Sequence, residues 1–341
     1  MTTANAKAAA RVTYQLETLW DYDYVPTHEE LDVLYETAKK NQWNASTAID
    51  WSRPVGQEGP VLNLRMALQG TRFFSQLGEA ELKEVEIRGS SWRLSQFLHG
   101  EQGALLVASQ LVTTVPDLDY KFYASTQVVD ESRHVEVFAR YLKKLHRIYP
   151  VDPLIKTLID EILASPVWEL KLLGMQMLIE GVAIAAFNVM HKQTGDPTLA
   201  AILDHVLQDE GRHVNFGYFA LKRSIAGMDP STRDHLEDFA FKACDALYGR
   251  DEHTGFQSVK SVWNEMGWDG DAVWRDVVTG SETLKTFNRL LFTKVLIPRL
   301  LRLGLISSRV EGRYRAIGLL EEREDGDGLD LGSLLSGVGT D

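Results

Sequence analysis

The chain has 341 residues, of which 44% are apolar, 36 are Lys or Arg and 48 are Asp or Glu, giving a formal net charge of -12. This apolar content is enough for a sizeable buried core, which excludes a disordered acidic chain and a disulfide-stapled miniprotein. The negative charge argues against nucleic acid as the main ligand, because nucleic-acid binders concentrate Lys and Arg on one face. Cys244 is the only cysteine and the N-terminal stretch lacks the apolar core of a secretory signal, so we expect a cytoplasmic protein.

Apolar residues recur at helical spacing from residue 84 to residue 248, and Pro and Gly fall between the periodic segments. This pattern predicts an all-α fold. The expected helices lie near residues 28–41, 84–114, 117–147, 153–164, 166–193, 197–227, 231–248 and 282–304, with further helical turns near 256–278.

Four helix starts carry capping signals. Thr27 and Glu30 have the spacing of a capping box. Asp152-Pro153, Ser165-Pro166 and Asp196-Pro197 each place a cap residue before a proline at the first helical position.

Residues 172–190 are long and apolar enough to resemble a membrane span. However, Gln176, Glu180 and Asn188 lie four and eight residues apart, and so form one polar stripe on an otherwise apolar helix. We therefore expect a helix in the middle of a bundle, with no membrane span. A carboxylate at that depth requires a partner or a metal ion.

The remaining segments suggest how the chain is divided. Residues 1–83 are expected to form an N-terminal wrapping segment and a helix, with Trp43 and Trp51 anchoring the non-helical stretch 42–62. Residues 84–248 are predicted to form a four-helix bundle, on which C-terminal helices from 249–320 pack. Residues 321–341 hold seven acidic residues, one Arg and five Gly, and are expected to be a disordered tail.

One sequence repeat carries chemically reactive residues. Asp130-Glu131-Ser132-Arg133-His134 recurs 79 residues later as Asp209-Glu210-Gly211-Arg212-His213. Glu101 and Glu180 obey the same offset, each lying 30 residues before the glutamate of its pentapeptide. Two copies of this extended pattern are far more specific than one match.

Helix geometry predicts that these residues meet. A Glu and a His three positions apart project from one helix face. The midpoints of the two glutamate spacings are Pro116 and Gly195, which are turn residues, so Glu101 is expected to face Glu131 and Glu180 to face Glu210 across two antiparallel hairpins.

The resulting set of four glutamates, with His134 and His213, is the ligand set of a dinuclear iron or manganese site in a bundle core. Two divalent cations would cancel the charge of four buried carboxylates. Carboxylate oxygens with one nitrogen per metal suit iron or manganese, although this ligand set does not exclude zinc or cobalt.

The repeated Asp130, Arg133, Asp209 and Arg212 are candidates for holding the metal-bound imidazoles, because such rings usually donate their second N–H to a carboxylate or carbonyl. The alternative is that they form solvent-facing charge pairs on the helices.

These residues resemble the ferritin-like di-iron carboxylate superfamily, in particular its oxygenase and ribonucleotide-reductase-like branch. The Asp-Glu-x-Arg-His context is similar to that of the hydroxylase subunits of bacterial multicomponent monooxygenases, and the resemblance covers about residues 92–225. It implies a ferritin-like bundle with two iron ions, or a Mn/Fe pair. It also implies Glu101, Glu131 and His134 on one ion, and Glu180, Glu210 and His213 on the other, with one or two glutamates bridging.

Two positions depart from the patterns of this superfamily. Phe138 occupies the place of the radical-forming tyrosine that ribonucleotide reductase small subunits carry four residues after the first His, which excludes a tyrosyl radical there. Ile184 replaces the Thr that is common in the monooxygenases, so a proton delivered by a hydroxyl group must come from elsewhere or from water.

A substrate pocket is predicted from positions three, four and seven beyond the ligands. These are mostly apolar and include small side chains, although packing of the bundle core is an equally good explanation for any one of them. The candidate lining residues are Ala104, Leu105, Ala108, Phe138, Ala183, Ile184, Phe187, Phe216 and Gly217.

The sequence thus favours an O2-dependent di-iron monooxygenase that hydroxylates, N-oxygenates or otherwise oxidises a small, largely apolar or aromatic molecule. Electrons are expected from a separate donor protein, because the chain has no cysteine cluster and no dinucleotide fingerprint. A homodimer is among the expected assemblies. The alternative is a ferritin-like metal-binding or radical-generating redox protein, with Fe/Fe or Mn/Fe, that does not oxygenate a substrate.

Overall fold

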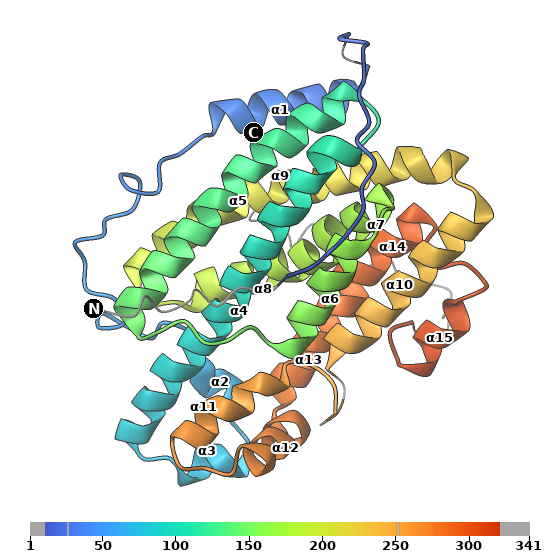
Figure 1. The fold of residues 1–341 in the computed structure, drawn as a ribbon. Coiled ribbons are helices and arrows are strands. Elements are labelled where there is room, and N and C mark those ends of the chain that lie inside the picture. Colours follow the sequence, from blue (N-terminus) through green and yellow to red (C-terminus); the bar gives the residue numbers. More distant parts are fainter. Residues whose placement is uncertain (1–10, 26, 250, 252, 321–341) are drawn as a thin grey trace, which may run out of the picture.

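The computed structural model describes residues 11–25, 27–249, 251 and 253–320. Every regular element within these residues is helical, which confirms the all-α prediction (Figure 1). The acidic segment 321–341, predicted to be a disordered tail, lies outside the described residues.

Four long helical segments form the central bundle. They are α4 (Glu79–Thr114), α5 (Leu118–Leu145), a segment that ends in α8 (Glu180–Gln193), and α9 (Pro197–Gly227). The third segment begins with α7 (Trp168–Leu172) and the π-helix η1 (Leu173–Ile179). α4 packs along α5 and α8 packs along α9, with short turns at the two predicted midpoints. The structure thus contains both predicted hairpins.

Two of the four predicted caps are formed. Asp152 accepts a hydrogen bond from the Leu154 N–H, and Asp196 accepts one from the Leu199 N–H. The Thr27–Glu30 capping box is wrong: Thr27 donates its N–H to Asp119 Oδ2 at 2.7 Å, which ties it to α5, and the cap residue is His28.

The predicted helix cap at Ser165 is also wrong, because the N-cap residue of this helix is Val167, two residues later. Its hydroxyl oxygen accepts a hydrogen bond from the Val167 N–H at 3.1 Å, closing a short turn, and the helix begins only at Trp168. Serine hydroxyls often stabilise such turns instead of capping a helix.

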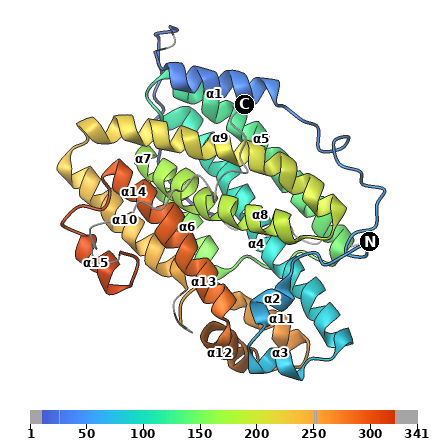
Figure 2. The same ribbon diagram turned by 180° about the vertical axis from the view of Figure 1, so that it is seen from behind.

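Further helices cover the bundle on several sides (Figures 1 and 2). α1 (Glu29–Lys40) lies across α5 and α9, and α6 (Pro153–Ala164) packs on α4 within the crossover between the hairpins. α10 (Pro230–Tyr248) packs on η1.

The expected helix over 282–304 is divided into α13 (Glu282–Leu290), the π-helix η3 (Leu291–Leu296) and α14 (Ile297–Leu303), with η3 packed on α8. α15 (Glu311–Ala316) follows. A group of short elements lies at the N-terminal end of α4 (Figure 1). These are α2 (Leu64–Leu68), α3 (Arg72–Gln76), the 3₁₀ turn η2 (Gln257–Val259), α11 (Lys260–Glu265) and α12 (Gly270–Gly280).

The segment Trp168–Gln193 is long and apolar enough to cross a membrane by length and composition alone. In the structure, 67% of its most apolar window is buried, and the segment packs against α9, α10 and η3. This is the behaviour of a core helix, as its polar stripe predicted.

Candidate metal centre and adjoining cavity

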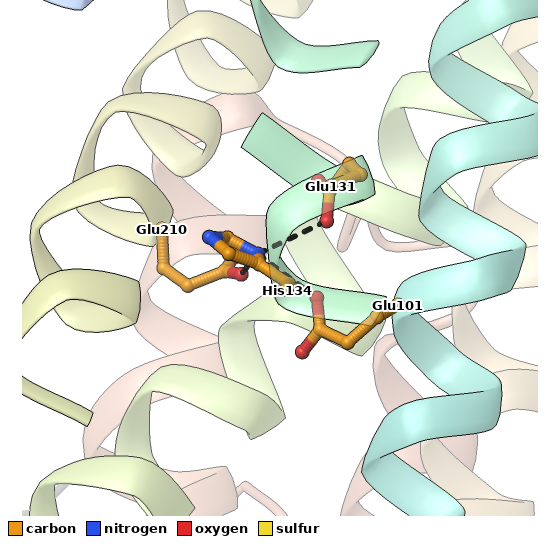
Figure 3. Close-up of side chains that lie close together, drawn as sticks. All are labelled: Glu101, Glu131, His134 and Glu210. Carbon is orange, nitrogen blue, oxygen red and sulfur yellow. Dashed lines mark hydrogen bonds and ion pairs between the residues drawn. The ribbon is translucent and has the colours of Figure 1, made fainter. Parts of the chain in front are cut away.

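The six predicted ligands converge in the middle of the bundle. Figure 3 shows four of them, Glu101, Glu131, His134 and Glu210. α4 supplies one glutamate, α5 and α9 each supply a Glu and a His from one helix face, and α8 supplies the fourth glutamate. No side chain of the set is more than 5% exposed. The set is Glu101, Glu131, His134, Glu180, Glu210 and His213.

The Nδ1 atoms of the two imidazoles point toward the glutamates. His134 Nδ1 lies 3.1 Å from Glu101 Oε2, 3.2 Å from Glu131 Oε2 and 3.2 Å from Glu210 Oε1. His213 Nδ1 lies 3.1 Å from Glu131 Oε1 and 3.5 Å from Glu210 Oε2. Glu131 and Glu210 therefore lie between the two imidazoles and have one oxygen near each.

The unpaired atoms of this cluster fit a pair of metal ions. Within the described part of the chain, five buried atoms of the cluster have no hydrogen-bond partner: both carboxylate oxygens of Glu210, Glu131 Oε2, Glu180 Oε2 and His213 Nδ1. Leaving buried polar atoms unpaired is costly, and bound cations would remove that cost. The ligand atoms form two groups, each within 4.8 Å: Glu101, Glu131, His134 and Glu210, and then Glu131, Glu180 and His213. Oxygen ligands with one imidazole in each group suit iron or manganese.

The negative charge of the buried glutamates also favours the binding of cations within the cluster. Burial and the neighbouring Glu210 raise the pKa of Glu101 and of Glu180 well above the usual range. Burial alone would lower the pKa of His134 and His213, but the surrounding carboxylates raise both. The carboxylates therefore favour any cation placed among them.

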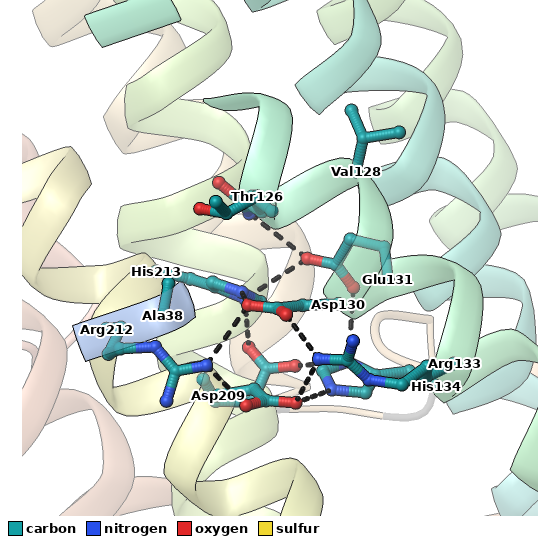
Figure 4. A network of polar contacts seen from close by, with 12 residues as sticks. Ala38, Thr126, Val128, Asp130, Glu131, Arg133, His134, Asp209, Arg212 and His213 are labelled. Atoms are coloured by element: carbon teal, nitrogen blue, oxygen red, sulfur yellow. Dashed lines mark hydrogen bonds and ion pairs between the residues drawn. The ribbon is translucent and has the colours of Figure 1, made fainter. Parts of the chain in front are cut away.

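Two aspartates hold the outer nitrogens of the imidazoles, and they do so crosswise (Figure 4). His134 Nε2 of α5 lies 3.1 Å from Asp209 Oδ2 of α9, and His213 Nε2 of α9 lies 3.2 Å from Asp130 Oδ2 of α5. Each aspartate thus orients the ring carried by the other hairpin, leaving Nδ1 directed at the glutamates.

Two arginines complete this arrangement. Arg133 Nη2 pairs with Asp130 and lies 3.4 Å from Asp209. Arg212 Nη2 pairs with Asp209 and lies 3.1 Å from Asp130. All four side chains are at most 9% exposed, so the alternative of solvent-facing charge pairs is wrong.

Three further side chains contact this network and were not predicted from the sequence to do so. Trp43 donates Nε1–H to Asp209 Oδ2 at 2.8 Å, and Gln42 donates to Asp130 Oδ1 at 3.2 Å. Gln127 donates to Glu131 at 3.1 Å and to Glu180 at 2.9 Å. Gln127 lies one turn before Glu131, so the helical period could have identified it, whereas the other two lie where no period exists.

A cavity of about 220 Å³ adjoins the cluster, and Glu101, Glu180 and Glu210 form part of its wall. Most of the lining is apolar and aromatic, and comes from α4, α8, the short elements around α11 and α12, and the α13–η3 segment. The aromatic side chains include Trp92, Phe97, Phe256, Trp263, Phe287 and Phe292.

The predicted pocket lining is corrected by this cavity. Ala104 and Ala183 line it, but seven other candidates do not: Leu105, Ala108, Phe138, Ile184, Phe187, Phe216 and Gly217. The reason is helix direction. On α4 the cavity is lined mainly by residues before Glu101, whereas on α8 it is lined mainly by residues after Glu180. Positions beyond each ligand therefore do not lie at one end of the bundle.

Ring contacts show the same antiparallel arrangement. The ring of Phe97, four residues before Glu101, has its centroid 4.7 Å from that of Phe187, which lies seven residues after Glu180. Phe216, which follows Glu210 on α9, instead packs against Tyr123, with 4.6 Å between the ring centroids. Tyr123 precedes Glu131 on α5. Phe187 and Phe216 are both buried in the core on different sides of the metal-binding cluster.

A match to a known protein family agrees with this geometry. The family model described as p-aminobenzoate N-oxygenase AurF matches residues 26–262. No curated protein sequence matches the chain. Among solved structures, one variant of an R2-like ligand-binding oxidase with a reconstituted Mn/Fe cofactor is 19% identical, with a TM-score of 0.48 over 82% of this chain and 93% of that one. A second variant is 19% identical, with a TM-score of 0.45 over 76% and 93%. Because the family model matches more than half of this chain, the chain belongs to the AurF family of ferritin-like di-iron N-oxygenases.

Proposed function

We propose that this di-iron oxygenase uses O2 to oxidise the nitrogen of a small aromatic amine bound in the cavity. The observation that carries the proposal is that Glu101, Glu180 and Glu210 belong both to the convergent ligand cluster and to the cavity wall. A substrate in the cavity would therefore lie directly against the metal ions. The family supports nitrogen as the site of oxidation.

In this proposal each metal ion has its own imidazole. Glu101 and His134 would hold one ion and Glu180 and His213 the other, while Glu131 and Glu210, which each have one oxygen near either imidazole, would contribute to both. The metal pair, which is iron with manganese as an alternative, would supply O2 binding and redox chemistry when bound. The crossed contacts to Asp130 and Asp209 support the ligand roles of both imidazoles, because they fix the rings with Nδ1 toward the ions.

The protein's other contribution is a dry, shaped site. The aromatic wall residues around α11 and α13 would hold an aromatic ring and exclude water. We also propose that electrons come from a separate donor protein, since the single cysteine cannot hold an iron-sulfur cluster. A cytoplasmic location is a further part of the proposal. A homodimer remains part of the proposal.

Single-turnover kinetics would test this function. The protein is loaded anaerobically with Fe(II) and mixed with O2 in the presence of p-aminobenzoate or aniline, and the products are identified by mass spectrometry. We expect the hydroxylamine, because one O2 accepts two electrons from the two Fe(II) ions and two from the amine nitrogen, and its second oxygen atom leaves as water. Glu131→Ala should abolish this product, because Glu131 contacts both imidazoles, whereas Glu136→Ala, an exposed glutamate on the same helix, should retain it. A mineral core of many irons per chain without oxidised amine would instead favour storage.

A further inference from the structure

A buried glutamine contacts both glutamates that are grouped with His213. Gln127 of α5 is fully buried, and its Nε2 lies 3.1 Å from Glu131 Oε1 and 2.9 Å from Glu180 Oε1. A carboxamide nitrogen carries two hydrogens, so this one group can donate to both carboxylates. Because the two glutamates lie on α5 and α8, Gln127 connects ligands of both hairpins.

The orientation of this carboxamide follows from its three partners. A metal-bound carboxylate only accepts hydrogen bonds, so the nitrogen of Gln127, and not its oxygen, must face Glu131 and Glu180. The oxygen then faces Gln176 of η1, whose Nε2 donates to it at 3.3 Å. Gln176 is also fully buried, and its Cβ packs against Gly217 of α9. The carboxamide of Gln127 is therefore held on both sides.

The two oxygens of Glu180 differ as a result. Oε1 accepts the hydrogen bond from Gln127, whereas Oε2 is buried and has no hydrogen-bond partner among the described residues. Glu101 and Glu210 receive no hydrogen bond from any carboxamide or hydroxyl group in the same part of the chain. Glu180 is thus a ligand with one oxygen already engaged by the protein and one left for a cation.

We propose that Gln127 makes Glu180 bind its metal ion through Oε2 alone, and so leaves a coordination position of that ion open toward the cavity. A glutamate can bind a cation through one oxygen or through both. Binding through both requires that Oε1 also turns toward the ion, which would break a charge-assisted hydrogen bond in a buried site. Glu180 lines the cavity, so a position that its second oxygen does not fill is reached from there.

This inference deepens the proposed function, because it names a residue that keeps one metal ion accessible to O2 or substrate, and it rests on the ligand roles proposed above. It does not require that an amine is oxidised. Gln127 acts here as a positioning residue, since it works through Glu131 and Glu180. Its effect can therefore be measured on the iron-loaded protein without turnover.

Crystal structures of the protein loaded anaerobically with Fe(II) provide the first test. In the unaltered protein we expect Glu180 Oε2 at bonding distance from an iron ion, and Oε1 within hydrogen-bonding distance of Gln127 Nε2. In Gln127→Met, whose side chain has a similar length but no donor, both oxygens should bond to that ion. Gln102→Met, the same change at an exposed glutamine of α4, is the matched control and should resemble the unaltered protein.

The reaction of the Fe(II) protein with O2, followed by stopped-flow absorbance, provides a second test. Gln127→Met should react at least about 10-fold more slowly, because the second oxygen of Glu180 then fills the open position. Gln176→Met retains both hydrogen bonds from Gln127 to the glutamates. It should therefore keep Glu180 bound through one oxygen and react at a rate close to that of the unaltered protein.

Two Glu180 oxygens bonded to iron in the unaltered protein would overturn the inference, as would one-oxygen binding that persists in Gln127→Met. The same change in Gln127→Met and Gln176→Met would also overturn it, since that pattern reports a structural role of the buried amide pair. Should Gln127→Met fail to bind iron, the coordination of Glu180 in the unaltered protein still decides.

The inference and the proposed function can fail separately. If Gln127 holds Glu180 to one oxygen but no amine is oxidised, the proposed function fails and the inference stands. If amines are oxidised while Glu180 binds iron through both oxygens, the proposed function stands and the inference fails.

Discussion

Asp209 shows how single residues join the parts of the metal centre. Its carboxylate accepts from Trp43 at 2.8 Å, lies 3.1 Å from His134 Nε2 and pairs with Arg212. These contacts hold its pKa below the usual range despite burial. One side chain therefore connects the N-terminal segment, α5 and α9, and fixes the orientation of an imidazole that lies on a different helix.

Replacing Asp209 should weaken the metal site. In Asp209→Ala, His134 loses the acceptor that orients its ring, so iron affinity should fall by about 10- to 100-fold. Anaerobic Fe(II) titration followed by equilibrium dialysis measures this change. Asp204→Ala, an exposed aspartate on the same helix, should bind iron normally. Equal iron affinity in both variants would show that the crossed contact does not orient the ligand.

The buried amine of Lys171 should make the free energy of unfolding depend on pH. It is fully buried, donates to Gln110 and to the carbonyls of Ile162 and Leu163 near the end of α6, and burial lowers its pKa to about 8. Between pH 8 and about 10.5 the unfolded chain binds the extra proton more readily than the folded chain.

The free energy of unfolding should therefore gain a contribution from Lys171 as the pH rises from 8 toward 10.5, and lose it as the pH falls back to 8. Lys171→Met should remove that contribution, so the difference between the two proteins should change across this window and stay constant below pH 7. Urea denaturation at several pH values measures it. A constant difference from pH 7 to 10.5 would contradict the lowered pKa.

At the scale of elements, α9 and η1 approach so closely that glycine is required. A Cβ on Gly217 would lie 2.6 Å from the Cβ of Gln176, an atom that cannot move without its helix. A Cβ on Gly211, six residues earlier on α9, would have no atom of the described residues within 4 Å apart from its chain neighbours and its own helix backbone. The two glycines thus form a matched pair on one helix.

We expect Gly217→Ala to reduce the free energy of unfolding by about 1–3 kcal/mol, because the added methyl overpacks the contact. Gly211→Ala should increase it by up to about 1 kcal/mol, because alanine favours the helix. Urea denaturation of both variants measures these changes. Equal effects would contradict the close approach of α9 and η1.

The helical elements and the metal-binding cluster could be predicted from sequence because both follow helical periods. Glu131 and His134 lie three apart, and Pro116 and Gly195 mark the two turns, so local arithmetic was sufficient. The cavity could not be predicted in this way. Its position depends on α4 and α8 running in opposite directions, and part of its wall comes from C-terminal elements that are distant in sequence from both helices. The π-helix before Glu180 likewise has no signal in the apolar pattern.

At the scale of the whole molecule, the net charge of -12 divides unequally. Residues 321–341 carry a net charge of -6, from seven acidic residues and one arginine. Of the remaining -6, four charges belong to the glutamates of the metal-binding cluster, which two divalent cations would neutralise. The acidity of the chain therefore says little about its partners, and much of it belongs to the metal site.

One chain is expected to hold two metal ions in this cluster. Crystals of the iron-loaded protein, measured at the iron absorption edge, test it most directly through the anomalous difference map. Two peaks per chain are expected, one beside Glu101 and His134 and the other beside Glu180 and His213, with Glu131 and Glu210 adjacent to both. One peak, no peak, or peaks away from these six side chains would contradict it.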